Sequence, residues 1–326
     1  MPIFAQFVGD DEVFNVVRRG ANNTRIESQH TGEQSLVPTQ ELFVFETDVE
    51  AEEGIIVPVT PLREFYRWLA PRTSFGLGYK FLHESLAVKC LNHPNELLNL
   101  FLNSVNQFEA FSNVDQTFHP DRPAFIQEPQ GNTAKLQWRL EGPQQNHELC
   151  ITDDEGNTVD QYLYLDREVS PGRIQGVKLA AENPSGKGGI DFLLSRRIND
   201  QSVIPVVAEV KIYRDKTPFF ALIQSLTYAA ELLSVWQQQR IQQTYADDIQ
   251  QATLRMPPQV ELLLLFVGLP DDLVPLLEVT EKIIANLLTN PSFAKLVPRV
   301  VVAVSPAMPQ PVEVFQISKN HRRVYS

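Results

Sequence analysis

The sequence predicts an α/β protein with a mixed central sheet, flanked by helices and preceded by a small β-rich region. Residues 190–213 contain two patterns rich in valine and isoleucine, joined by a polar stretch, which are typical of adjacent strands. Apolar residues at helix spacing lie before and after this pair. The order strand, helix, strand between residues 260 and 305 predicts a right-handed parallel crossover beside the pair.

The N-terminal region, residues 1–75, is predicted to be small and mostly β-rich. Its short apolar alternations, among them IFAQFVG, EVFNVVRR and ELFVFETDV, are separated by polar stretches. Residues 76–326 are predicted to form the larger domain, with a β-hairpin inserted in it.

Three helices are predicted between residues 60 and 111. Thr60 and Pro61 mark the first start, because threonine caps a helix and proline fits its first position. Helical patterns follow over residues 79–90 and 94–111, with a break before Pro94. Residues 112–134 are then predicted to be a long connection.

Strands are predicted to resume after that connection. The segment KLQWRLEG, residues 135–142, is the first of them, and residues 173–180 fit another. Between the two, residues 147–169 predict a hairpin that turns at residues 154–157, where Asp, Glu, Gly and Asn stand between apolar runs.

The residues with a chemical pattern lie on the central pair of strands. Glu209 and Lys211 are two apart on the predicted strand PVVAEVKIY, which begins at Pro205, so their side chains project on one face. Asp191, on the neighbouring strand, would add a second carboxylate. Two carboxylates suit a divalent cation such as Mg²⁺, which lowers the pKa of a bound water and stabilises a phosphorane-like transition state. Lys211 would orient the nucleophile or help to deprotonate it, so the trio indicates phosphodiester hydrolysis.

Simpler interpretations of the same residues stay open. A Glu-x-Lys pair also fits a solvated ion pair across a strand face, and an aspartate after two glycines also fits a turn. Gln224 and Tyr228 share a helix face at i and i+4 on the predicted helix that begins after Thr217, whatever their role. After Trp236 this helix becomes glutamine-rich, which predicts a protruding tip or a contact surface.

The C-terminal part completes the predicted sheet. VELLLLFVG, from Val260 onward, is a buried-strand pattern, and RVVVAVS is its parallel partner after one helix. PVEVFQIS is predicted to be an edge strand. The basic tail KNHRRVYS fits an exposed end or, alternatively, a contact with phosphates.

The order Gly-Gly-Ile-Asp, Ala-Glu-Val-Lys and Gln-x-x-x-Tyr resembles the PD-(D/E)XK nuclease superfamily, which has the restriction-endonuclease-like fold. The Gln224 and Tyr228 pair is similar to the helix motif of its RecB-type branch. The resemblance covers roughly residues 160–305 and departs from the pattern in having Ile190 where proline precedes the aspartate. It implies that Asp191 and Glu209 bind metal, that Lys211 positions the attacking water, and that Gln224 and Tyr228 line the site.

Further residues are candidates because of this resemblance. The fold places an acidic residue on a helix before its sheet, so Glu84 is a candidate additional metal ligand, with His83 beside it and Glu96 and Glu109 as competitors; an ordinary surface role fits Glu84 as well. The chain is locally basic between residues 178 and 216. The candidate nucleic-acid contacts there are Lys187, Arg196, Arg214 and Lys216.

Composition limits the class of protein. A net charge of −12 and a pI near 5 argue against a broad sequence-blind DNA surface, because such binding comes from neutralising phosphates. Two cysteines argue against a disulfide framework, and the start of the chain argues against a secretory signal, so a cytoplasmic location is expected. We therefore expect a nuclease that uses Mg²⁺ or Mn²⁺ and acts on DNA, without a membrane. A protein partner or a homo-oligomer stays open, as does a catalytically silent binding module on the same fold.

Overall fold

The structure is a computed structural model of the 326-residue chain, and it describes the following parts. They are residues 3–8, 13–18, 23–28, 34–38, 48–50, 56–58, 60–69, 76–110, 132–140, 148–153, 155–169, 171, 189–213, 217–250, 252–306, 314–316 and 322–326.

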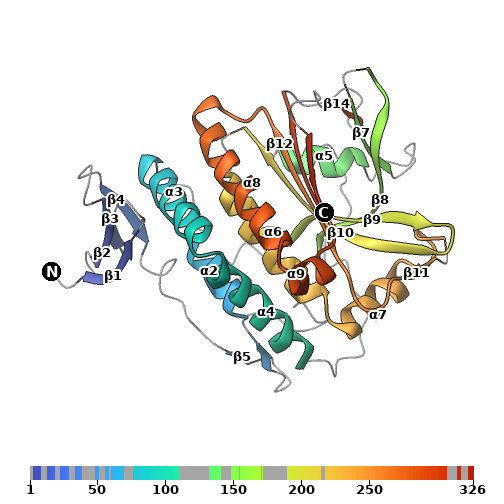
Figure 1. Ribbon diagram of the computed structural model, residues 1–326, viewed down its shortest axis with the longest axis horizontal. Helices are drawn as coiled ribbons and strands as arrows, with labels where there is room; N and C mark the ends of the chain where they lie inside the picture. Colours follow the sequence, from blue (N-terminus) through green and yellow to red (C-terminus); the bar gives the residue numbers. More distant parts are fainter. Residues whose placement is uncertain are drawn as a thin grey trace.

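A mixed nine-stranded sheet forms the centre of the molecule (Figure 1). Its order is β14-β7-β8-β9-β10-β12-β13-β15, with β11 beside β10. Strands β10, β12 and β13 run parallel, and β9 is antiparallel to β10. The predicted α/β class, hairpin and parallel crossover are therefore confirmed. The strands are β7 (Glu148–Thr152), β8 (Thr158–Val169), β9 (Ile190–Asn199), β10 (Ser202–Ile212), β11 (Thr253–Leu254), β12 (Glu261–Val267), β13 (Val300–Ser305), β14 (Val314–Gln316) and β15 (Arg322–Tyr325).

Strand β10 begins three residues earlier than its sequence predicts, at Ser202, and Pro205 lies within it. Proline has no N–H for a sheet, so an interior position needs a reason. On one side β10 pairs with β11 only through Ser202 and Val203, and its pairing with β12 starts at Val206. Pro205 lies between these two pairings, where neither partner needs an N–H from it.

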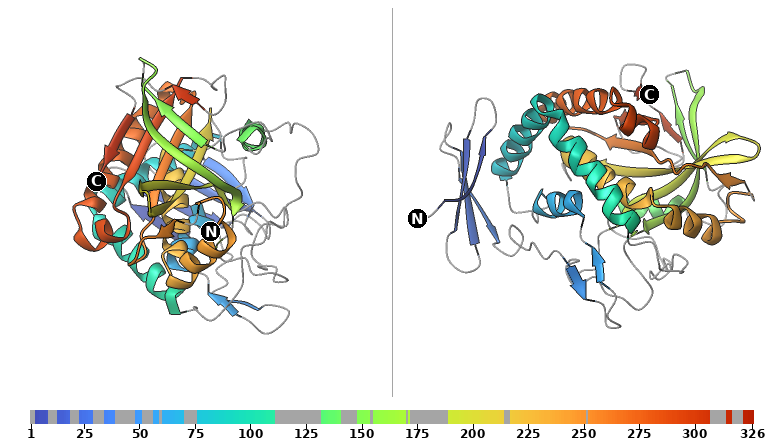
Figure 2. Two further views of the ribbon diagram at one scale, coloured as in Figure 1. Left: turned by 90° about the vertical axis from the view of Figure 1, so that its right-hand side faces the viewer. Right: turned by 60° about the horizontal axis from the view of Figure 1, so that its bottom comes forward.

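Helices cover one face of the sheet, and α5 packs on the other (Figures 1 and 2). The covered face packs leucine, valine and phenylalanine against α3, α4, α6 and α8. Helix α6 lies directly on β10 and β12 and is buried along its whole length. The helices are α2 (Pro61–Leu69), α3 (Gly76–Asn92), α4 (Pro94–Ala110), α5 (Asn132–Leu140), α6 (Pro218–Leu232), α7 (Val235–Thr244), the short η1 (Asp271–Leu273), α8 (Val274–Leu288) and α9 (Pro291–Leu296).

The N-terminal strands form a separate antiparallel sheet in the order β1-β2-β3-β4, next to α3 (Figure 2). Helix α2 follows them but packs against α4 and α6 of the larger part. The boundary at residue 75 stays a prediction. The strands are β1 (Ile3–Val8), β2 (Val13–Arg18), β3 (Asn23–Ser28) and β4 (Gln34–Pro38), followed by the pair β5 (Asp48–Glu50) and β6 (Ile56–Pro58).

Three local predictions are wrong. Residues 135–140 of the strand expected at 135–142 belong to helix α5, in which Leu136 and Leu140, one turn apart, are both buried. Residues 141 and 142 lie outside the described residues. The glutamine-rich extension does not protrude, because Trp236, Gln237 and Arg240 of α7 are buried. The basic tail is not a free end, since β15 pairs antiparallel with β13. In each case a tertiary contact decides over local composition.

Among the residues described, no single helix is long and apolar enough to cross a membrane. Helices α6 and α7 pass that test of length and composition only together, across a bend of 90°.

Candidate functional site

Asp191 lies where strands β9 and β10 separate. Their pairing ends at Phe192 and Ala208, and beyond it the Asp191 carboxylate accepts the next backbone hydrogen bond, from Val210 N at 2.9 Å. Two residues before Asp191, Gly189 lies against β8, and a Cβ there would lie 2.3 Å from the backbone carbon of Glu168. Packing against the β8 backbone therefore requires a glycine at position 189.

The ammonium of Lys211 connects the two predicted carboxylates. Its Nζ atom lies 2.9 Å from Glu209 Oε2 and 3.2 Å from Asp191 Oδ2. Lys211 is 5% exposed, and Asp191 is the most accessible of the three, with 14% of its side chain exposed. The structure therefore brings together the three residues that the sequence predicts as the core of the site.

Glu209 is completely buried, at 0% exposure, and only one of its oxygens has a described partner. Its Oε1 atom has no hydrogen-bond partner among the described residues. Burial raises the pKa of the Glu209 carboxyl well above its usual value, because an ionised carboxylate loses its water there. The neighbouring Asp191 carboxyl raises this pKa further, and Lys211 opposes both effects.

Helix α6 carries Gln224 and Tyr228 across the same face of the sheet. Thr217 begins the helix, since its Oγ1 accepts from Phe220 N at 3.2 Å and Pro218 takes the first position. Both predicted side chains are buried. Gln224 Oε1, like Glu209 Oε1, is buried without a hydrogen-bond partner among the described residues.

Helix α2 supplies side chains that the sequence analysis missed. Tyr66, which is partly buried, packs its ring against Tyr228, with centroids 6.1 Å apart. The pKa of Tyr66 rises to about 12, mainly because its phenol is desolvated and secondly because of the Glu209 charge. Arg63 lies 5.1 Å from the centre of the Tyr228 ring and forms a two-pronged ion pair with Glu231 at 2.6 and 2.5 Å. The i, i+3 spacing of Arg63 and Tyr66 is visible in the sequence, but their partners more than 160 residues away are not.

Glu84, the candidate additional ligand, lies on α3. Its carboxylate pairs with Lys80 at 3.6 Å, and Lys80 also contacts Asp272 of η1. His83 is buried in the core, where it contacts Thr217 Oγ1 at 2.6 Å and stacks on Phe220. The competitors Glu96 and Glu109 contact Lys89 and Val235 N respectively.

The predicted nucleic-acid contacts are only partly described. Lys187, Arg214 and Lys216 lie outside the described residues. Arg196 is described, and it lies toward the opposite end of β9 from Asp191, where it pairs with Glu261 of β12.

Comparisons with protein-family models, with curated proteins and with solved structures find no match to this chain.

The donor atoms of these residues are of the type that binds a hard divalent cation. Asp191 and Glu209 provide carboxylate oxygens, and the buried oxygens Glu209 Oε1 and Gln224 Oε1 have no described donor. Mg²⁺ is typically held by one or two carboxylates and keeps waters and substrate oxygens as its other ligands. Among the described residues, no group of three or more His, Cys, Asp or Glu side chains is arranged to hold a metal ion.

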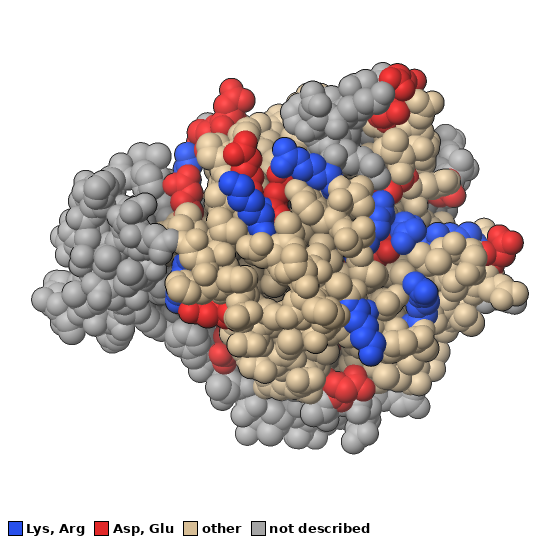
Figure 3. Space-filling model, viewed as in Figure 1, with Lys and Arg blue, Asp and Glu red and all other residues tan. Residues whose placement is uncertain are grey.

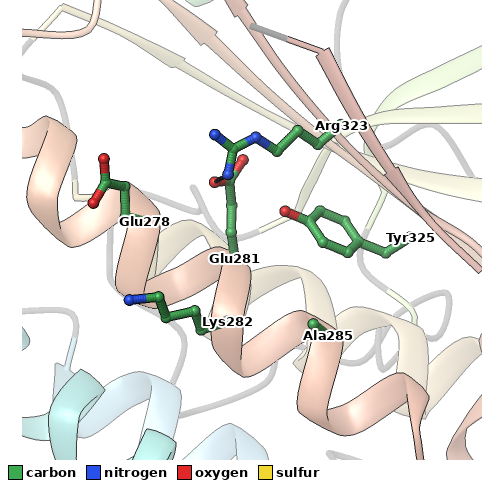
Figure 4. A pocket seen from close by; sticks show the side chains of 6 residues that line it. All are labelled: Glu278, Glu281, Lys282, Ala285, Arg323 and Tyr325. Atoms are coloured by element: carbon green, nitrogen blue, oxygen red, sulfur yellow. Dashed lines mark hydrogen bonds and ion pairs between the residues drawn. The ribbon is translucent and has the colours of Figure 1, made fainter. Parts of the chain in front are cut away.

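A pocket of about 250 Å³ opens elsewhere, between α8 and β15 (Figure 4). In it Arg323 reaches toward Glu281, with which it forms an ion pair, and Tyr325 lies beside them. Acidic and basic groups balance across this pocket, so its charge favours neither an anion nor a cation. The other lining residues are Glu278, Lys282 and Ala285.

Proposed function

We propose that the protein is a metal-dependent nuclease that hydrolyses phosphodiester bonds of DNA, with Mg²⁺ as its ion and Mn²⁺ as a substitute. The observation that carries this proposal is the convergence of Asp191 and Glu209 on the ammonium of Lys211. The buried acceptor oxygens of Glu209 and Gln224 support it, because buried polar atoms are normally satisfied and unsatisfied ones need an explanation.

Each residue has a defined task in this proposal. When bound, Mg²⁺ would lower the pKa of water and offset negative charge at phosphorus. Asp191 and Glu209 would hold the ion. Lys211 would orient the attacking water and donate hydrogen bonds where negative charge develops. Gln224 and Tyr228 would shape the buried wall, and Tyr66, a neutral phenol near Glu209, would keep bulk water from that wall.

One observation favours a second candidate, a catalytically silent binding module on the same fold. Glu209 is fully buried and Lys211 already neutralises one carboxylate, so the trio also fits a structural ion-pair group. A buried ion pair of this kind can fix a fold without any chemistry.

Incubation with mixed nucleic acids, with and without Mn²⁺, separates the two candidates when it includes the Lys211→Ala protein. We expect cleavage that needs the ion and disappears in the variant. Calorimetry with Mn²⁺ should also show that Glu209→Gln loses ion binding. An ion that binds the Glu209→Gln protein as tightly as the original, or a wild-type protein without cleavage, would leave only the silent module.

A further inference from the structure

Tyr213 directly follows β10, and its backbone is strained. Its φ of 55° lies in the left-handed region, which costs free energy for a residue with a bulky side chain. A hydrogen bond of 2.7 Å from Tyr213 N to Val267 O holds the backbone there. The residue after Val267 is Gly268, where a Cβ would lie 2.6 Å from Cε1 of the Tyr213 ring. One edge of the ring therefore rests on Gly268.

The side chain of Tyr213 is open to solvent in spite of this contact. Tyr213 is 50% exposed, so burial of its ring offsets only part of the strain. Among the described residues, it is the aromatic member of the large hydrophobic side chains that stay exposed; the others are Val235, Met256, Val274 and Val324. Backbone strain of this kind is concentrated at sites that bind or react with a ligand. An exposed ring on a strained backbone therefore points to a ligand.

Tyr213 lies at the carboxyl end of three parallel strands, near the proposed site. The last residues of β10, β12 and β13 lie side by side, and Gly268 N donates to Ser305 O at 2.8 Å beyond them. Ligands of open α/β sheets bind outside the carboxyl ends of such strands. Tyr213 follows Lys211 by two residues, which is about 7 Å along a strand. A ligand held at Lys211 is thus close enough to reach the ring.

The charged side chains at this edge do not form a surface for phosphate. The short η1, which begins three residues after Gly268, contains the exposed Asp271 and Asp272. Lys80 lies 3.6 Å from the carboxylates of both Asp272 and Glu84. Figure 3 shows acidic and basic side chains interspersed around the end of α8 that follows η1. A neutral ring at such an edge favours the flat face of a ligand over an anion.

We propose that Tyr213 stacks on a nucleobase beside the phosphate that is cleaved. This inference rests on the proposed nuclease for the identity of the ligand and adds the group that holds its base. Aromatic side chains bind the bases of unpaired strands by stacking, with little dependence on sequence. A ring already fixed in place loses little conformational entropy on binding, and the strained backbone and the Gly268 contact provide that fixation. Tyr213 thus favours a strand whose bases are unpaired at the cleaved bond.

The test compares a single-stranded DNA oligonucleotide with an abasic strand of the same length, because only the first offers bases for stacking. The value of kcat/KM is measured for both with Mn²⁺. The test variant Tyr213→Gly fits the φ of 55° and removes the ring, whereas Tyr213→Phe keeps a ring. The matched control, Tyr325→Ala, removes a tyrosine from β15 that pairs with Val300, at the other end of β13.

Wild type, Tyr213→Phe and Tyr325→Ala should prefer the normal strand by at least about tenfold. Tyr213→Gly should cleave both strands alike, at about the rate of wild type on the abasic strand. The melting temperature of Tyr213→Gly should not fall, because glycine relieves the strain at this φ. A Tyr213→Gly protein that keeps the preference would overturn the inference. If its melting temperature also fell, the ring would be a structural contact of Gly268.

Fluorescence anisotropy in EDTA separates this inference from the nuclease proposal. The same two oligonucleotides are titrated without cleavage, and the preference for the normal strand should again need Tyr213. Absent cleavage with binding that depends on Tyr213 would count against the nuclease alone. Cleavage that is unchanged in Tyr213→Gly would count against stacking alone. A wild-type protein that neither binds nor cleaves either strand would overturn both.

Discussion

Two buried glutamates on neighbouring strands of the same sheet differ in how their charge is compensated. Glu261 of β12 is 2% exposed, and both of its oxygens accept from Arg196, at 2.7 and 2.5 Å. Glu209 of β10 is 0% exposed, shares the single ammonium of Lys211 with Asp191, and leaves Oε1 without a described partner.

This difference separates a structural ion pair from a candidate site. A planar guanidinium can donate to both oxygens of one carboxylate, so Glu261 needs no further partner. An ammonium shared between two carboxylates leaves negative charge in excess, which disfavours the folded state. A protein that retains such an arrangement gives up stability, and sites of function are where this happens.

The largest expected effect is on cleavage. Asp191→Ala should lower the rate of Mn²⁺-dependent cleavage at least about 10³-fold, because it removes a metal ligand and an acceptor for Lys211. The rate is measured with the nucleic acid that wild type cleaves. Glu261→Gln is the control, and it should cleave within about threefold of wild type. Equal losses of cleavage in both variants would mean that the Asp191 group and the Glu261 group do not differ in function.

The next largest effect is expected on the stability contributed by Glu261 and its two arginine partners. Glu261→Ala should lower the free energy of unfolding by about 2 to 3 kcal/mol, since Arg196 and Arg299 would lose a buried partner. This expected loss is smaller than is usual for breaking a buried ion pair, because the two arginine side chains are 28% and 15% exposed. Urea titration measures the change. A loss below about 0.5 kcal/mol would show that this pair is not structural.

Glu209→Gln should instead raise the free energy of unfolding, by about 1 kcal/mol at neutral pH, because a neutral amide avoids the cost of a buried excess charge. The gain should depend on pH. The folded-state pKa of Glu209 is raised above its ordinary value of 4.5, so wild type loses stability as pH rises from about 4.5 through the folded pKa.

Urea titrations of both proteins across that pH range check this prediction. The two stabilities should meet below pH 4.5, where Glu209 is protonated in the folded and the unfolded protein. A difference that does not change with pH would argue against an ionised Glu209, and a destabilised Glu209→Gln protein would place Glu209 with Glu261 as a structural residue.

The smallest effect is expected at Gln224. Gln224→Leu removes a buried amide oxygen that has no described partner, so stability should rise by about 0.5 kcal/mol, while cleavage should fall about three- to tenfold. Thermal unfolding and the cleavage assay together measure it. The comparison variant is Thr227→Val, three residues further along α6. The Thr227 hydroxyl is satisfied, because it donates to Ile223 O at 2.8 Å, so this variant should lose stability instead.

The core of the candidate site was predictable because its signals are local. Glu209 and Lys211 share a face by strand alternation, and Asp191 lies on the neighbouring strand. Arg63 and Tyr66 were not predictable as site residues, since their helix reaches α6 only through the fold. Arg196 was predicted to contact nucleic acid because the sequence around the site is locally basic, and the structure places it toward the other end of β9 from Asp191, where it pairs with Glu261.

The sequence alone determined the α/β class, the helix starts at Thr60 and Thr217 and the parallel crossover, because periodicity and capping act over a few residues. Tertiary structure decided the helical state of residues 132–140, the burial of α7 and the pairing of the C-terminal strand. It also decided which buried acid is fully paired and which is not. Burial and ion pairing depend on side chains from segments that are distant in sequence, and the composition of a short stretch does not indicate which distant segment will pack against it.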